Sequence, residues 1–148
     1  MSQDELSRLN LDEDYEKVLG CLDAQRWTLK RADGTLEVWA TMWSAACPEE
    51  KFQARLQWAE YPQQPPSLRF RDPASGCLDL PTAWPQVRGF RPTSLDACVN
   101  WCLEGFGLHP EWNNDPRLRW DPRGNVLLRV LRTLQDELDN HFQGRFRG

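Results

Sequence analysis

The stretch that most limits how this chain can fold is YPQQPPSLRFRD, which begins at Tyr61. Proline fixes its own φ at about −65° and restricts the preceding residue to extended geometry, so Pro62, Pro65 and Pro66 exclude a helix and a central strand here. Apolar and polar residues alternate over residues 51–60 and again after the prolines, which is the period of half-buried strands. We therefore expect a stiff corner between two strands. An ordinary hairpin loop with extra prolines fits the same residues.

Upstream of the corner, the sequence predicts one helix and a hairpin. Apolar residues recur every three or four positions near the acidic N-terminus, so we expect an amphipathic helix over about residues 3–24 that lies on a sheet. These apolar residues are Leu6, Leu9, Tyr15, Val18, Leu19 and Leu22. Asp33 and Gly34 have the chemistry of a two-residue hairpin turn. We expect an antiparallel meander of four strands, at residues 27–29, 36–42, 51–60 and 67–71.

Downstream of the corner, a long irregular segment precedes a final helix. Over residues 72–120 the periodicity fades and prolines and glycines are frequent, and such segments inside compact domains tend to be functional. Asp121 is a good N-cap and Pro122 suits a first turn, so we expect a helix that runs to about residue 142 and stops at Gly144. Its apolar face would consist of Leu127, Val130, Leu131, Leu134, Leu138 and Phe142.

Length, charge and cysteine content narrow the class of protein. A chain of 148 residues is expected to form a single α+β domain over residues 1–148. Its net charge of −4, with interspersed signs, argues against a nucleic-acid or membrane-surface role. The acidic N-terminus lacks the apolar run of a signal peptide or a membrane span, so we expect a cytoplasmic protein. Five cysteines without framework spacing are expected to be reduced thiols.

The order of elements and two local motifs resemble the ubiquitin-conjugating enzymes. The corner that begins at Tyr61 matches the family's YPxxPPxxxF motif, and Trp120-Asp121-Pro122, with the apolar helix after it, matches its WxP motif. The similarity runs from the first helix to the last. It implies the family's fold: an N-terminal helix, a four-stranded antiparallel meander, a long active-site segment and a C-terminal helix.

The sequence departs from the eukaryotic pattern of this family near the cysteines. Eukaryotic members carry His-Pro-Asn before the active cysteine, whereas the comparable place here, from Gly89 to Thr93, reads GFRPT and lacks both the histidine and the oxyanion asparagine. His109-Pro110 instead follows the cysteines. In this respect the chain is more similar to divergent prokaryotic members, which are encoded beside ubiquitin-like modifiers, activating enzymes and isopeptidases.

The resemblance implies a carrier thiol that accepts the C-terminus of a ubiquitin-like protein from an activating enzyme and passes it to an amine, without a cofactor or a metal. Such a thiol must be accessible, and a cysteine on a rigid loop qualifies. Cys98, in polar loop-like sequence, is the favoured candidate. Cys102 is the alternative, because the residues after it resemble the eukaryotic Cys-Leu-Asp, but it fits a turn of a packed helix equally well.

His109 is the candidate partner of this thiol, because a neutral imidazole can take a proton from an amine or donate to the thioester oxygen. A histidine that caps or packs within its own turn is the alternative. Asn100, Asn113 and Asn114 are candidates for the missing oxyanion donor, although the last two also form an ordinary turn signal. His141 is expected on the exposed side of the last helix.

Two other functions remain open. The chain could be an inactive relative on the same scaffold, which binds a ubiquitin-like protein or its activating enzyme without chemistry. Alternatively, Cys98, Cys102 and His109 could hold a structural metal together with His141 or Cys77, although Cys-x₃-Cys without a second pair is a weak zinc signal.

The resemblance also implies protein partners. These are the ubiquitin-like modifier, an activating enzyme that contacts the first helix, and a ligase that contacts the proline corner and the loop before the last helix. Neither a nucleic acid nor a membrane is expected as a partner. The candidate docking residues are Tyr61, Pro62, Pro65, Pro66, Trp120 and Pro122.

Overall fold

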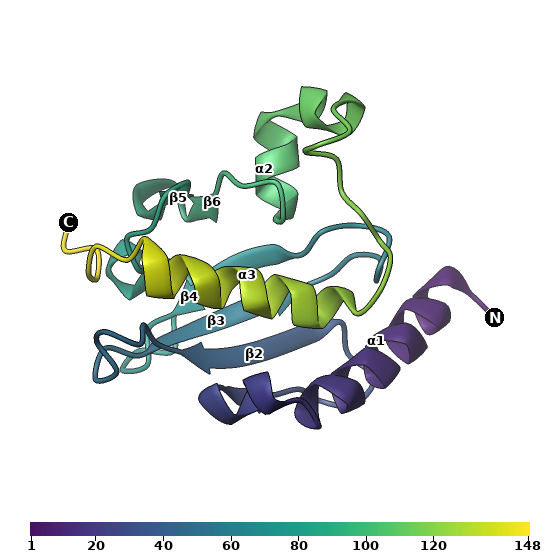
Figure 1. The fold of residues 1–148 in the computed structure, drawn as a ribbon, viewed down its shortest axis with the longest axis horizontal. Coiled ribbons are helices and arrows are strands. Elements are labelled where there is room, and N and C mark those ends of the chain that lie inside the picture. Colours follow the sequence, from purple (N-terminus) through teal and green to yellow (C-terminus); the bar gives the residue numbers. More distant parts are fainter.

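The computed structural model describes residues 1–148 and has an α+β fold (Figure 1). Helix α1 (Gln3–Leu19) is followed by a four-stranded antiparallel sheet, and helix α3 (Val126–Asn140) lies over one face of that sheet. The strands are neighbours in chain order, as the sequence predicts. They are β1 (Thr28–Lys30), β2 (Glu37–Met42), β3 (Phe52–Gln57) and β4 (Ser67–Arg71).

The two faces of the sheet differ as the alternation of the sequence predicts. Successive side chains of a strand point to opposite faces, so every second residue lies under α3. Those residues are fully buried and belong to one hydrophobic cluster with the apolar face of α3. They are Val38, Ala40, Met42, Phe52, Ala54, Leu56, Leu68 and Phe70. The intervening residues form the opposite face and are half-exposed or exposed.

The first hairpin contains the two-residue turn that Asp33 and Gly34 predict. The Thr35 amide donates to the Ala32 carbonyl at 3.2 Å across it, and Gly34 adopts a positive φ of 76°. The strand pairing stops before the turn, at Lys30 and Trp39, so the whole connection between β1 and β2 is several residues longer. The Arg31 guanidinium also binds this loop, because its Nε donates to the Thr35 carbonyl at 3.1 Å.

Helix α1 is shorter than predicted and buries a different face. It begins after a capping box formed by Ser2 and Glu5 and ends before Gly20, and a separate 3₁₀ turn follows at Leu22–Arg26. Its buried residues are Ser7, Leu11 and Val18, whereas the leucines at positions 6, 9, 19 and 22 are exposed. Of the predicted apolar stripe, Val18 is buried and Tyr15 packs against the core, but the four leucines are wrong, because the contact of α1 with α3 and with the proline corner determines which side is covered.

Helix α3 buries the predicted face but begins later than predicted. Asn125, not Asp121, is the N-cap, and its side chain accepts a hydrogen bond of 3.0 Å from the Leu128 amide. Gly124 has a φ of +76°, a left-handed conformation that interrupts a helix started at Pro122. Asp121 instead pairs with Arg123 in the preceding turn.

The segment between the sheet and α3 is less irregular than predicted. It contains a small hairpin, formed by β5 (Phe90–Arg91) and β6 (Asp96–Ala97), and a short helix α2 (Leu103–Leu108). Helix α2 begins beside the start of β4, where the Leu103 amide donates to the Pro66 carbonyl at 2.8 Å, and it projects outward from there (Figure 1). Three 3₁₀ turns complete the segment, at Pro81–Ala83, Pro92–Ser94 and Pro110–Asn114.

The proline corner joins α1, the sheet and α3. Tyr61, which precedes Pro62 through a cis peptide bond, is fully buried. Its hydroxyl donates to the Asp14 carboxylate and accepts a hydrogen bond of 3.0 Å from the Leu127 amide, and its own amide donates to Ser7 Oγ at 3.1 Å. The corner is therefore a structural junction. None of the helices combines the length and the apolar character needed to cross a bilayer.

Candidate active site

Cys98 directly follows the β5–β6 hairpin, which holds its backbone in place. Phe90 pairs with Ala97, and the Arg91 guanidinium donates to the Asp96 carboxylate at 2.7 Å. The Cys98 amide then donates to the Gly89 carbonyl at 2.7 Å, which continues the pairing by one step. The thiol is half-buried and free.

Two glycines allow other parts of the chain to approach the backbone next to Cys98. A Cβ atom at Gly89, whose φ is +83°, would lie 2.7 Å from Val99 Cγ1 and 3.1 Å from the Cys98 carbonyl oxygen. A Cβ atom at Gly105 in α2 would lie only 2.0 Å from the Val99 carbonyl oxygen. Since Val99 is in contact with both glycines, the loop that carries Cys98 is held from two directions.

Cys98 lines an open pocket of about 350 Å³ between this loop and α3. Two further pockets adjoin it: one of about 210 Å³ shares Asn100 and Trp101 with it, and one of about 540 Å³ shares Arg88 with it. The three hollows follow α3 and the residues just after it, from Arg129 to Phe142, with the Cys98 pocket between the other two. The Cys98 pocket is lined by Arg88, Gly89, Cys98, Val99, Asn100, Trp101, Trp112, Leu118 and Glu137.

Cys102 does not fit the role of an accessible thiol. Its exposure is 0 %, and it belongs to the hydrophobic cluster at the start of α2. Burial raises the pKa of the Cys102 thiol well above its ordinary value, because the thiolate would lose its hydration. The packed-helix interpretation of Cys102 therefore holds, and its candidacy as the carrier thiol is corrected.

His109 lies outside the pocket of Cys98. It is the residue after α2, where its ring stacks on Trp112 with the ring centroids 4.5 Å apart. His109 Nδ1 lies 2.9 Å from Glu111 Oε1, and this contact lowers the pKa of the Glu111 carboxyl. Only Trp112 of this group reaches the pocket, so the structure does not bring the predicted thiol and imidazole together in one site.

Asn100 is the predicted polar residue that shares the pocket with Cys98. Its side-chain Nδ2 donates to the Leu118 carbonyl at 3.3 Å, which leaves one N–H and the carbonyl oxygen of this amide free. Asn113 and Asn114 lie in the exposed 3₁₀ turn, and Asn113 Nδ2 donates to the Pro110 carbonyl at 3.2 Å. The turn interpretation therefore holds for these two residues.

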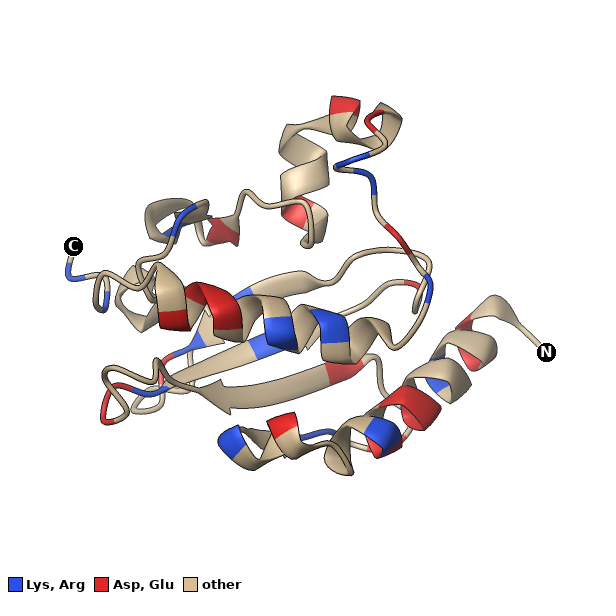
Figure 2. Cartoon of the chain, viewed as in Figure 1, with Lys and Arg blue, Asp and Glu red and all other residues tan.

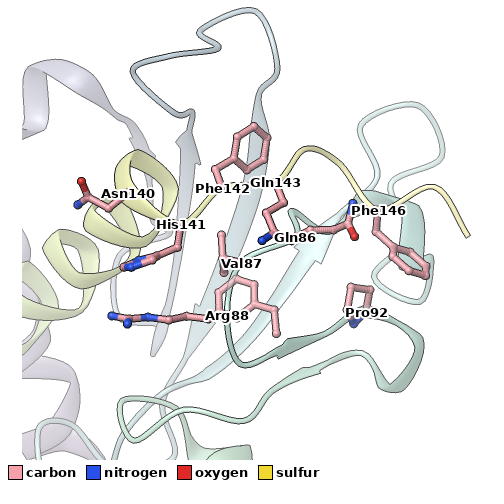
Figure 3. Close-up of a pocket in the computed structure, with 10 residues that line it drawn as sticks. Gln86, Val87, Arg88, Pro92, Asn140, His141, Phe142, Gln143 and Phe146 are labelled. Carbon is pink, nitrogen blue, oxygen red and sulfur yellow. The ribbon is translucent and has the colours of Figure 1, made fainter.

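Sequence reasoning missed the ion pair of Arg88 and Glu137, which lines the Cys98 pocket, and His141 beside it in the adjoining pocket. Arg88 Nε lies 3.1 Å from both Glu137 carboxylate oxygens, and Arg88 Nη2 lies 3.0 Å from Oε1. His141 Nδ1 lies 3.2 Å from Oε2, without the angle of a hydrogen bond. Figure 3 shows the Arg88 and His141 side chains side by side, and 39 % of the His141 side chain is exposed, in line with the surface position that the sequence predicts.

Glu137 is nearly buried, with 11 % of its side chain exposed, and it lines the Cys98 pocket. No periodicity or motif in the sequence identifies Glu137 as a functional residue, because it lies beside Leu138 on the buried side of α3. A charged residue among the apolar positions of an amphipathic helix is the one signal that could have identified it.

Burial also corrects part of the predicted docking surface. Tyr61, Pro65 and Pro66 are buried, so they cannot contact a partner. Trp120 is half-buried, and its Nε1 donates to the Pro62 carbonyl at 2.9 Å, which ties the corner to the loop before α3. The exposed part of the predicted surface consists of Pro122 and the accessible sides of Pro62 and Trp120.

The residues considered for a metal site do not come together. Nowhere in residues 1–148 do three His, Cys, Asp or Glu side chains gather in an arrangement that could hold a metal ion. The ligand set that combines Cys98, Cys102 and His109 is thus not assembled.

Comparison with known proteins does not identify the chain. No protein-family profile, no curated protein and no solved structure matches it. The fold and the site define an α+β protein with a half-exposed cysteine in a pocket against its C-terminal helix, and no family is assigned beyond that.

Proposed function

We propose that this chain has the fold of the ubiquitin-conjugating enzymes and acts as one. In this proposal Cys98 accepts the C-terminus of a ubiquitin-like protein from an activating enzyme as a thioester and transfers it to an amine of a target protein. The observation that carries the proposal is the position of Cys98: the residue is only half-buried, its loop is held by Gly89 and Gly105, and it lines an open pocket.

The chemistry requires little beyond an accessible, well-positioned thiol. The Cys98 thiolate attacks the carbonyl carbon of the incoming thioester, a new C–S bond forms, and the thiolate of the activating enzyme leaves. An amine then attacks the Cys98 thioester, its nitrogen forms the C–N bond and loses a proton, and the Cys98 thiolate leaves. A loop that does not move keeps the carbonyl in one place for both attacks.

The pockets along α3 support an extended substrate. The C-terminal tail of a ubiquitin-like protein must reach the thiol as a single extended strand, which needs a groove rather than a closed cavity. The three adjoining hollows provide such a path past Cys98, with Arg88 and Asn100 where neighbouring hollows join. Arg88 is mostly exposed and Asn100 keeps free amide groups, so both can hydrogen-bond to a peptide backbone.

The exposed side of α1 supports a protein partner at the N-terminal helix. Leu6 and Leu9 are 40 % and 50 % exposed, and they stand three residues apart on one side of the helix. Solvent-exposed leucines at this spacing are suited to helix-mediated docking. We assign this side of α1 to the activating enzyme.

The test is thioester formation with a candidate modifier, a candidate activating enzyme and ATP. We expect an adduct that reductant releases, that Cys98→Ala abolishes, and that Cys98→Ser converts into a reductant-resistant ester. Cys77→Ala, at an exposed cysteine away from the pocket, is the matched control and should leave the adduct intact. An adduct that survives Cys98→Ala contradicts the assignment of the thiol.

A second function, that of an inactive scaffold, is favoured by one observation. The Cys98 pocket contains no histidine, and its asparagine amide already donates to the Leu118 carbonyl. A scaffold would bind the modifier or the activating enzyme without forming a covalent bond. Two results together would support the scaffold instead. The unmodified chain would form no adduct, and titration calorimetry with the modifier or the activating enzyme would give the same affinity for Cys98→Ala as for the unmodified chain.

A further inference from the structure

The face of the sheet opposite α3 gathers basic residues from three strands. Cross-strand pairing places Lys30, Trp39, Arg55 and Arg69 in one row across the sheet. A second row consists of Thr28, Thr41, Gln53 and Arg71. Glu37 is the one acidic residue that alternates onto this face within the four strands. Figure 2 shows the basic positions in blue on β3 and β4.

These basic residues lack the ion pairs found elsewhere in the chain. Of the 18 Lys and Arg residues, ten form salt bridges with carboxylates of their own chain. Half of the remaining eight lie on this face. A chain with a net charge of −4 therefore leaves a local excess of positive charge on one side.

Arg55 and Arg69 face each other across β3 and β4. Like charges at directly paired positions destabilise a sheet, and a hydrogen bond of 3.4 Å from Arg69 Nη1 to the Leu78 carbonyl offsets only part of this cost. Burial lowers the pKa of the Arg55 guanidinium, and Arg69 lowers it further against the opposing effect of Glu37 and Glu104. Arg55 Nε is buried and has no hydrogen-bond partner. An anion beside the two guanidinium groups would relieve the repulsion between them.

A hollow beside these arginines offers a place for such an anion. Its volume is about 210 Å³, and Lys30, Trp39, Thr41, Gln53 and Arg71 are among the residues that line it. The Arg71 guanidinium lies over the Trp39 ring, 5.6 Å from its centroid. The hollow thus combines two exposed cations with a flat aromatic surface and hydrogen-bonding side chains, which suits an acidic side chain and its apolar neighbour.

We propose that this face is a docking surface for an acidic segment of a partner protein. Carboxylates of the partner approach Lys30, Arg71 and the Arg55–Arg69 pair, and Trp39 supplies the apolar contact. A nucleic acid fits less well, because its long run of phosphates would meet the acidic remainder of this chain. The surface lies on the opposite side of the sheet from α3, so the proposal does not depend on the chemistry of Cys98.

The test uses a labelled peptide of alternating Glu and Asp residues at about physiological salt, where weak surface attraction is screened. We expect amide and indole NMR shifts confined to β1–β4 and Trp39. Lys30→Gln with Arg71→Gln should weaken binding at least about tenfold, since charge-assisted contacts are lost. Arg117→Gln with Arg123→Gln removes the same charge at exposed positions away from the sheet and should leave the affinity within about twofold.

Each alternative outcome overturns the proposal in a distinct way. Shifts spread over the whole surface mean that attraction is unspecific. Tighter binding of a duplex oligonucleotide than of the peptide makes the ligand a nucleic acid. If sedimentation shows concentration-dependent dimers, and Lys30→Gln with Arg71→Gln abolishes them, the occupant of this face is a second copy of the chain. Arg55→Gln with Arg69→Gln provides a second pair, and it should bind the peptide more weakly while its melting temperature stays the same or rises.

Discussion

The close approach of α2 to the loop that carries Cys98 predicts that Gly105→Ala destabilises the protein. The new Cβ would meet the Val99 carbonyl oxygen at 2.0 Å, so the contact must open to the 3.4 Å of an ordinary contact, a displacement of about 1.4 Å. The neighbour is backbone and cannot rotate away, so we expect a cost of about 3 kcal/mol. Alanine has a higher helix propensity than glycine, which stabilises the variant by about 1 kcal/mol. The net loss is about 2 kcal/mol, or about 4–8 °C in melting temperature.

Gly107→Ala is the matched control for this prediction. Gly107 lies in the same short helix, but a Cβ atom added there would have no other atom within 4 Å. The same substitution should therefore raise the melting temperature by about 1–4 °C. Thermal denaturation followed by circular dichroism measures both variants. If Gly105→Ala is as stable as Gly107→Ala, the loop beside Cys98 is not clamped by α2, and the argument for a rigid thiol is refuted.

Three further predictions concern the corner and the thiols. Tyr61→Phe should lower the free energy of unfolding by about 1–3 kcal/mol, because it removes the hydrogen bond to Asp14 and leaves the buried Leu127 amide unpaired. Denaturant titration measures this loss, and the control Tyr15→Phe should lose less than about 0.5 kcal/mol. Burial raises the pKa of the Asp14 carboxyl above its ordinary value of 3.8. The stability that the protonated carboxyl contributes to the fold is therefore fully present below about pH 3.8, and it is lost as the pH rises through the folded-state pKa. The melting temperature of Asp14→Asn relative to the unmodified chain should therefore increase from about pH 4 to about pH 7, and a flat difference contradicts this. Iodoacetamide and mass spectrometry should label Cys98 in the folded protein but Cys102 only after unfolding, because its thiol is buried.

The sheet could be predicted from the sequence because one face is buried and the other is not. Under that condition burial alternates strictly along each strand, as at Val38, Ala40 and Met42, and the pattern survives in the sequence. Helix α1 could not be predicted as well. Its buried side depends on contacts with α3 and with Tyr61, more than forty residues away, so Ser7 is buried while Leu9 is exposed.

The start of α3 shows how two local signals compete. Asp121-Pro122 has the composition of a helix start, but the Gly124-Asn125 pair that follows provides a left-handed residue and a side-chain cap. The later signal determines the start because Asn125 also donates to the Asp14 carbonyl at 3.2 Å, a contact with α1 that the earlier position does not offer. A tertiary contact thus selects between two adequate caps.

The candidate site depends even more on tertiary contacts that the sequence pattern does not show. Cys98 and Asn100 are close in sequence, so loop-like composition was enough to suggest both. Arg88 and Glu137 are 49 residues apart, and only the folded position of α3 opposite the Cys98 loop makes them neighbours of the thiol. His109 fails as the predicted partner for the same reason, since proximity along the chain does not determine the direction in which the end of α2 points.

The basic face of the sheet could not be predicted from the order of charges along the sequence. Lys30, Arg55, Arg69 and Arg71 belong to three strands and are separated by apolar residues, so the sequence shows interspersed charge and no basic stripe. Period-two alternation and pairing register place them side by side. An absence of charge clustering in a β-rich sequence therefore excludes only linear patches. It does not exclude a charged surface that the sheet assembles, and the partner expected from the linear sequence and the partner expected from the folded surface can differ.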